Sequence, residues 1–134
     1  MIDTMIGLPF KAGGRGPVYY DCYGLVRLFY EKCYEITLPT HTGYSETLTE
    51  RSSAMIAANL CEWVEVADPQ YGDVILFNID GRPNHIGIYL DRDTMLHTSR
   101  SKDSCIEKFK RSYWLNKIEG YYRYGDISLQ TPST

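Results

Sequence analysis

One cysteine of this sequence stands where a thiol is easiest to ionise. Residues 21–26 read Asp-Cys-Tyr-Gly-Leu-Val, directly after a loop rich in glycine and proline. Asp21 is a favourable N-cap residue, and apolar residues recur from Leu25 at helical spacing, so Cys22 is expected to begin a helix. The first N–H groups of a helix and its dipole stabilise a thiolate. Cys22 is therefore the candidate nucleophile; the alternative is a small buried side chain.

The other three cysteines lack this setting. Cys33 falls on the apolar face of the same predicted helix, and Cys61 and Cys105 have no helix start beside them. No Cys-x-x-Cys pair of the kind used by zinc and iron–sulfur sites is present in the sequence. Disulfides are not expected without a secretion signal. We therefore expect no metal and no cofactor.

A nucleophilic cysteine needs a base, and the chain has three histidines. His85 begins the strand-like segment HIGIYL, and His97 lies near the end of TMLHTS. If residues 91–93 form a three-residue hairpin loop, His85 and His97 share one face as diagonal neighbours. His85 would then accept the thiol proton, and His97 would hold its ring in the useful tautomer. His41 lies in a polar loop and is predicted to be a solvated side chain.

The order of the predicted elements indicates an α+β fold. A short helix is expected within residues 1–8, a helix of three to four turns from Cys22, and a third helix from the capping box at 47–50 to about Leu60. An antiparallel meander of about five short strands follows, in the segments WVEVA, VILFN, HIGIYL, TMLHTS and CIEKF. A short helix near 111–116 and a last strand in GYYRY complete the prediction.

Size and charge narrow the class of protein. With 134 residues, we expect one domain over residues 1–124 and a loosely ordered tail over 125–134. The net charge of −3 disfavours nucleic acid as a partner. The start MIDTMIGLPF does not resemble a secretion signal, and no stretch predicts membrane insertion, so we expect synthesis in the cytoplasm. A basic stretch over 100–111 is read as a solvated strand and turn, or as a contact for an acidic polymer or a partner protein.

Three segments carry a family resemblance: IGLPFKAGGRGPVYYDCYGLV, YGDVILFN and HIGIYLDRDTMLH. In this order they resemble the NlpC-type family of cell-wall endopeptidases, which are papain-like cysteine peptidases. The similarity runs from Ile6 to His97 and, through GYYR, nearly to the end of the chain. It implies a papain-like fold in which Cys22 is the nucleophile, His85 the general base and His97 the residue that orients it.

The region around the cysteine is most similar to the tail-assembly proteins of long-tailed phages, the group of the lambda tail protein K. Tyr23 stands where Ser is usual, which implies a narrower groove. Phe10 stands where many members carry Tyr, so a hydroxyl at the oxyanion site is missing or is supplied by Tyr19, Tyr20 or Tyr23. We expect Phe10, Asp21 and Tyr23 to lie beside the substrate.

The resemblance implies hydrolysis of an amide bond in peptidoglycan stem peptides, between D-glutamate and the diamino acid, through an acyl-enzyme on Cys22. The expected partners are the stem peptide and phage tail-tip proteins, with the protein in the host cytoplasm during synthesis and then at the virion tail tip. Two alternatives remain open. One is a tail-tip assembly module with little turnover, and the other is a papain-like amidase or acyltransferase.

Overall fold

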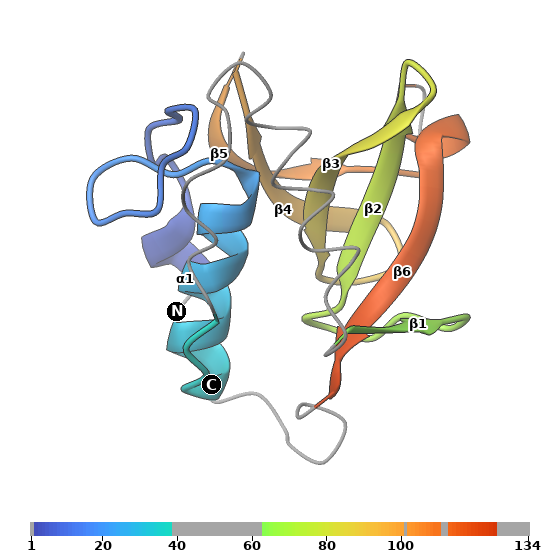
Figure 1. The fold of residues 1–134 in the computed structure, drawn as a ribbon, viewed down its shortest axis with the longest axis horizontal. Coiled ribbons are helices and arrows are strands. Elements are labelled where there is room, and N and C mark those ends of the chain that lie inside the picture. The colour runs from blue at the N-terminus through green and yellow to red at the C-terminus, as the bar shows by residue number, and fades with distance from the viewer. Residues whose placement is uncertain (1, 39–62, 101, 111–112, 126–134) are drawn as a thin grey trace.

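The computed structural model describes residues 2–38, 63–100, 102–110 and 113–125. Within them, one α-helix stands beside a curved six-stranded sheet (Figure 1). The elements are η1 (Ile2–Met5), α1 (Cys22–Tyr34), β1 (Trp63–Val66), β2 (Val74–Ile79), β3 (Arg82–Tyr89), β4 (Thr94–Ser99), β5 (Lys102–Lys108), η3 (Leu115–Lys117) and β6 (Ile118–Tyr124). The helix predicted over 47–60, His41 and nearly all of the predicted tail lie outside the described residues.

The sheet confirms the α+β prediction and corrects its strand order. Strands β2 to β5 form the predicted meander, and the GYYRY segment forms β6. However, β6 lies between β1 and β2, so β1 pairs with β6 rather than with its sequence neighbour. Arg123 of β6 donates from Nε and Nη2 to the two carboxylate oxygens of buried Asp73, at 2.9 and 2.8 Å. This bidentate ion pair holds β6 against the turn that precedes β2.

The helix α1 begins where the sequence predicts. Asp21 is fully buried, and its Oδ1 accepts the Gly24 N–H at 2.7 Å, as an N-cap does. Its Oδ2 pairs with Nη1 of Arg15 from the preceding loop at 2.5 Å. The helix ends at Glu35, which adopts the left-handed conformation (φ 57°) and donates its N–H to Glu31 and Tyr30 carbonyls. Among the described residues no helix is both long and apolar enough to cross a bilayer.

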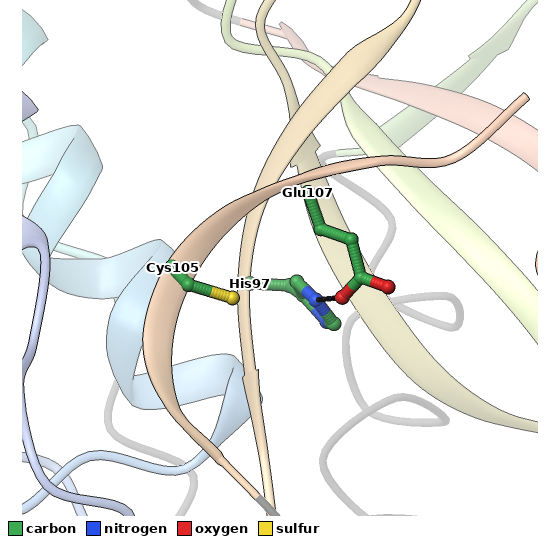
Figure 2. Close-up of side chains that lie close together, drawn as sticks. All are labelled: His97, Cys105 and Glu107. Carbon is green, nitrogen blue, oxygen red and sulfur yellow. Dashed lines mark hydrogen bonds and ion pairs between the residues drawn. The ribbon is translucent and has the colours of Figure 1, made fainter.

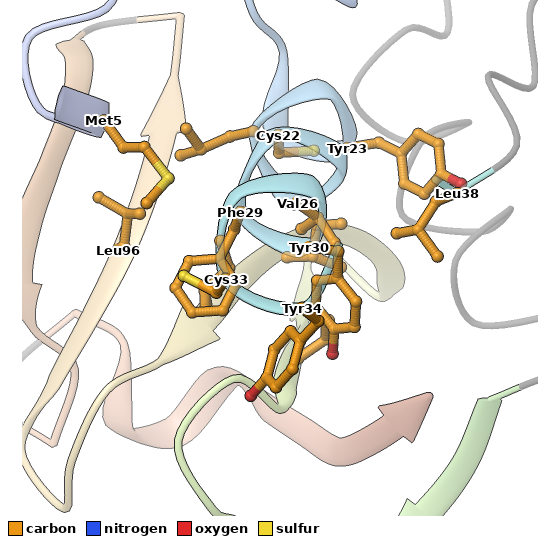
Figure 3. Packing of buried hydrophobic residues seen from close by; sticks show 14 of the residues in the cluster. Met5, Cys22, Tyr23, Val26, Phe29, Tyr30, Cys33, Tyr34, Leu38 and Leu96 are labelled. Atoms are coloured by element: carbon orange, nitrogen blue, oxygen red, sulfur yellow. The ribbon is translucent and has the colours of Figure 1, made fainter. Parts of the chain in front are cut away.

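Apolar residues cover both faces of the central strands. On one face, α1 packs its predicted apolar stripe against the sheet, and Figure 3 shows these side chains gathered around the helix. This cluster includes Cys22, Leu25, Val26, Phe29, Cys33, Val74, Leu76, Ile86, Ile88 and Leu96. A second cluster contains Ile75, Phe77, Tyr89, Met95, Phe109 and Trp114. Because side chains alternate along a strand, residues of odd number on β3 and β4 belong to the second face.

We predict that Asp21→Ala lowers the free energy of unfolding by about 3 to 5 kcal/mol, because it removes the helix cap and the carboxylate that pairs with the largely buried Arg15 side chain. Asp21→Asn keeps a capping oxygen and should lose less. The exposed Asp103→Ala is the control and should change stability by under about 0.5 kcal/mol. Urea unfolding measures all three. Equal stability of Asp21→Ala and Asp103→Ala would contradict this account of how α1 begins.

Candidate active site

The two strand histidines meet as the sequence predicts. Leu90 donates its N–H to the Thr94 carbonyl at 3.0 Å, which closes the three-residue loop between β3 and β4. The Oδ1 of Asp91 caps this loop by accepting the N–H groups of Asp93 and Thr94 at 2.8 and 2.9 Å. In the resulting register, His85 Nε2 and His97 Nδ1 lie 3.0 Å apart. Both side chains are buried.

A carboxylate that sequence reasoning missed completes the chain of contacts. The Oε1 of Glu107 on β5 lies 2.7 Å from His97 Nε2, and its Oε2 accepts the Trp114 indole N–H at 3.0 Å. The Trp114 ring also stacks on His85, with centroids 5.1 Å apart. The signal for Glu107 lay in the β4–β5 register, because Cys105 is the partner of His97 and Glu107 follows two residues later on the same face.

Burial and hydrogen bonds together decide the charges of His85, His97 and Glu107. Burial lowers the pKa of His85 to about 3, an effect that adjacent His97 reinforces and Glu107 opposes. Burial also lowers the pKa of His97, although the hydrogen bond and charge of Glu107 act to raise it. For Glu107, burial alone would raise the pKa, but hydrogen bonds from Trp114, His97 and Lys102 outweigh it and the pKa falls. Both imidazoles are therefore neutral at neutral pH, and Glu107 is a carboxylate.

These charges set the direction of the hydrogen bonds. A carboxylate only accepts, so His97 carries its proton on Nε2 and donates it to Glu107. The His97 Nδ1 then accepts from the Nε2–H of His85. The remaining nitrogen of His85, Nδ1, holds a lone pair, and no hydrogen bond to it is present within the described residues. The chain Glu107–His97–His85 therefore presents a base at His85 Nδ1.

The predicted nucleophile begins α1 but belongs to a different set of contacts. Cys22 is 1% exposed and packs in the cluster on the α1 face. His85 lies on the other face, in ring contact with Phe77, His97 and Trp114. The structure thus assembles the two histidines, and the contact of Cys22 with them stays a prediction.

The three residues predicted to lie beside the substrate have packing roles here. Phe10 is half-buried and forms an isolated backbone bridge with Tyr20. Asp21 and Tyr23 are fully buried, and the Arg15 guanidinium that pairs with Asp21 also lies over the Tyr23 ring at 5.1 Å. These contacts stabilise the loop before α1, and a substrate contact for Phe10, Asp21 or Tyr23 stays a prediction.

A pocket of about 430 Å³ opens beside the histidines. Its walls include His85, His97 and Trp114, and Arg100 and Lys102 from the basic stretch add positive charge. Glu107 also lines the pocket and pairs with Lys102, so positive and negative side chains both face this space.

Residues 7–123 match the NlpC/P60 family. The chain belongs to this family. It is 26% identical over 130 residues to the gamma-DL-glutamyl hydrolase of Bacillus subtilis (strain 168), covering 95% of this chain and 29% of that protein. It is also 26% identical over 122 residues to the probable peptidoglycan endopeptidase LytE of the same organism, covering 90% of this chain and 32% of LytE. The chain thus spans about a third of the length of these two relatives.

Solved structures of the NlpC/P60 family share the fold. A family member from Bacillus cereus ATCC 10987 superposes with a TM-score of 0.67 at 21% identity, over 91% of this chain and 37% of that one. The P60 domain of an antigen from M. avium subspecies paratuberculosis gives a TM-score of 0.61 at 16% identity, over 92% and 88% of the two chains. The NlpC-type fold predicted from the sequence is therefore confirmed, and the α+β arrangement is consistent with a papain-like fold.

We predict that Glu107→Gln mixes the tautomers of both histidines, because an amide can donate as well as accept. The ¹⁵N NMR spectrum of the wild type should show an unprotonated Nδ1 on His85, and Glu107→Gln should move this signal toward the protonated range. Glu119→Gln makes the same chemical change at a residue that contacts Asn78 instead, and should leave the signal in place. A protonated His85 Nδ1 in the wild type would contradict the hydrogen-bond direction.

Proposed function

We propose that this protein is a cysteine endopeptidase that hydrolyses an amide bond in peptidoglycan stem peptides, between D-glutamate and the diamino acid. The observation that carries the proposal is the hydrogen-bonded chain Glu107–His97–His85, which ends in a buried, neutral imidazole with a lone pair on Nδ1. A lone pair held in one tautomer is what a general base for a thiol requires. The names of related proteins support the substrate class, since they include a gamma-DL-glutamyl hydrolase and a probable peptidoglycan endopeptidase.

The proposed reaction begins when the Cys22 thiol reaches His85 Nδ1 and gives up its proton there. Sulfur attacks the scissile carbonyl carbon, and the backbone N–H of Cys22 at the helix start stabilises the oxyanion. His85 then gives the proton to the leaving amine as the C–N bond breaks. Water gives a proton to His85 and attacks the thioester carbonyl carbon. The C–S bond then breaks, the peptide leaves as a carboxylic acid, and the Cys22 sulfur takes the proton back from His85. The whole reaction requires the Cys22 sulfur to approach His85 Nδ1.

The electrostatic interaction expected between Cys22 and His85 supports this proton transfer. The low pKa of His85 is caused by burial and by adjacent His97. A thiolate against Nδ1 would raise that pKa, because opposite charges favour the ionised forms of both groups. Glu107 would stabilise the resulting imidazolium through His97, which is the residue that contacts His85 directly.

The pocket supports a carboxylate-rich substrate. Arg100 and Lys102 line the pocket beside the histidines, and the Lys102 ammonium is paired there with the Glu107 carboxylate. Stem peptides carry free carboxylates beside their amide bonds, so these side chains are suited to hold the peptide close to His85.

We also propose that the enzyme acts as part of a phage tail tip, made in the host cytoplasm and carried to the cell wall by the virion. The support is the sequence around Tyr23, which resembles tail-assembly proteins. The competing function is an assembly module with little turnover. The polarised histidine chain favours the enzyme, because docking does not require a buried base. An amidase or acyltransferase would use the same thiol and differ in its products.

Digestion of purified peptidoglycan tests the activity. The wild type should release stem peptides cut at one amide bond, identified by mass. Cys22→Ala should lower the rate by at least about 10³-fold because it removes the nucleophile. Cys33→Ala removes another buried thiol of α1 and should stay active. Release of the same peptides by Cys22→Ala would exclude the proposed nucleophile, and no release by any variant would favour the assembly module.

Mass spectrometry of purified particles tests the tail association. If the chain is carried at the tail tip, particles of the phage that encodes it should contain the protein, and chemical cross-links should join it to tail-tip subunits. Absence from the particle, or cross-links to capsid subunits alone, would contradict that location without affecting the peptidase assignment.

A further inference from the structure

A third polar side chain meets the His97–Glu107 pair. Cys105 on β5 is the direct partner of His97 on β4, and Glu107 lies two residues further on the same face. One ligand atom from each of the three residues lies within 4.8 Å of the other two. Figure 2 shows the Cys105 sulfur directed toward the His97 ring, with the Glu107 carboxylate on the other side of that ring. The mechanism proposed above uses no part of Cys105.

The donor set selects a class of metal. Imidazole nitrogen, thiolate sulfur and carboxylate oxygen together suit zinc and its divalent neighbours, whereas magnesium and calcium require oxygen ligands. Zinc held at its usual bond lengths in a tetrahedron spaces its ligand atoms about 3.3 to 3.6 Å apart. The present His97 Nε2 to Glu107 Oε1 distance is 2.7 Å, so a bound ion would replace that hydrogen bond after a small side-chain shift. Three protein ligands would leave one position for water or another ligand.

Neighbouring groups already orient two of these ligands. The other nitrogen of His97 is hydrogen-bonded to His85, and the other oxygen of Glu107 accepts from the Trp114 indole. Metal-binding imidazoles and carboxylates typically have such outer contacts. His97 and Glu107 both line the pocket, which gives an ion a route to them. The Lys102 ammonium lies 3.3 Å from Glu107 Oε1 and is half exposed, so it is the cation that an arriving metal would displace.

We propose that His97 Nε2, Cys105 Sγ and a Glu107 carboxylate oxygen bind a divalent ion of the zinc class, and that this binding switches off the base at His85. The ion occupies the Nε2 lone pair of His97, so the proton of that ring moves to Nδ1. His97 then donates to His85 Nε2, and the His85 proton moves to Nδ1. A protonated Nδ1 cannot accept the thiol proton. The Cys105 thiol releases one proton to solvent, which balances the step.

The binding half of this inference stands independently of any peptidase activity. The inhibitory half rests on the proposed function, because it assigns the role of base to His85. The two halves are therefore measured separately.

Titration of the purified, reduced protein with Co²⁺ tests the binding half. The wild type should bind about one ion with the intense visible bands of tetrahedral cobalt and a thiolate charge-transfer band. Cys105→Ala should lose the thiolate band and weaken the Kd at least about tenfold. Cys22→Ala and Cys33→Ala remove other thiols and should keep both signals. Loss of the thiolate band in Cys22→Ala and its survival in Cys105→Ala would overturn the proposed site.

Lys102→Gln provides a test that does not depend on removing a ligand. It takes away the cation that competes for Glu107, so the Kd for Co²⁺ and Zn²⁺ should become smaller by several-fold. An unchanged or weaker Kd in Lys102→Gln would place the ion away from Glu107 and contradict the site.

Two readouts test the switch. Zn²⁺ should move the ¹⁵N signal of His85 Nδ1 from unprotonated to protonated in the wild type and leave it unmoved in Cys105→Ala. For each protein, the ratio of peptidoglycan-cleaving rates with Zn²⁺ and with EDTA should fall at least about tenfold in the wild type and less in Cys105→Ala. Metal binding without the tautomer change would overturn the switch. If the metal binds and the tautomer changes, but the metal-free protein in EDTA does not cleave peptidoglycan, the proposed function is wrong and the metal site stands.

Discussion

The 3.0 Å contact between His85 Nε2 and His97 Nδ1 depends on the register in which β3 and β4 pair. A slip of one residue would turn every side chain of one strand to the opposite face and separate the two rings. The loop capped by Asp91 fixes this register at one end of the hairpin. Gly87 makes room nearby, since a Cβ at that position would come within 2.6 Å of the Met95 sulfur. Local hairpin geometry therefore creates the base on which the proposed chemistry depends.

The side chains around His85 and His97 determine which ring nitrogens of these residues carry protons. Trp114 stacks on His85 and also donates its indole N–H to Glu107, so one side chain packs against the base and orients the acceptor at the other end of the chain. Two neutral imidazoles can be buried because three of their four ring nitrogens are hydrogen-bonded. The same arrangement places Cys105 beside His97, where a metal ion would reverse the direction of the hydrogen bonds. In the proposed active state His85 and His97 carry their protons on Nε2, and in the proposed metal-bound state they carry them on Nδ1.

Structural features that depend on residues close together in the sequence were predictable. The Asp21 cap, the apolar stripe of α1 and the loop at 91–93 depend on adjacent residues, and together they predicted the start of the helix and the meeting of His85 with His97. The place of β6 between β1 and β2 was not predictable in this way, because it depends on contacts such as that of Arg123 with Asp73, which are far apart in the chain. Glu107 was missed because its position follows from a second strand register, and Trp114 because it comes from an irregular segment. The contact of Cys22 with His85 stays a prediction.

The rate of iodoacetamide alkylation of Cys22 as a function of pH tests the central claim most directly, with Cys33 as an internal control. Both cysteines lie on α1 and are almost equally buried, at 1% and 2% exposure, and burial raises the pKa of Cys33. If His85 activates Cys22, Cys22 should react at about pH 6 at least about tenfold faster than Cys33. His85→Ala should remove this difference. If Cys22 reacts no faster than Cys33 from about pH 6 to 9, the thiol and the base do not form a working pair, and the proposed mechanism is wrong.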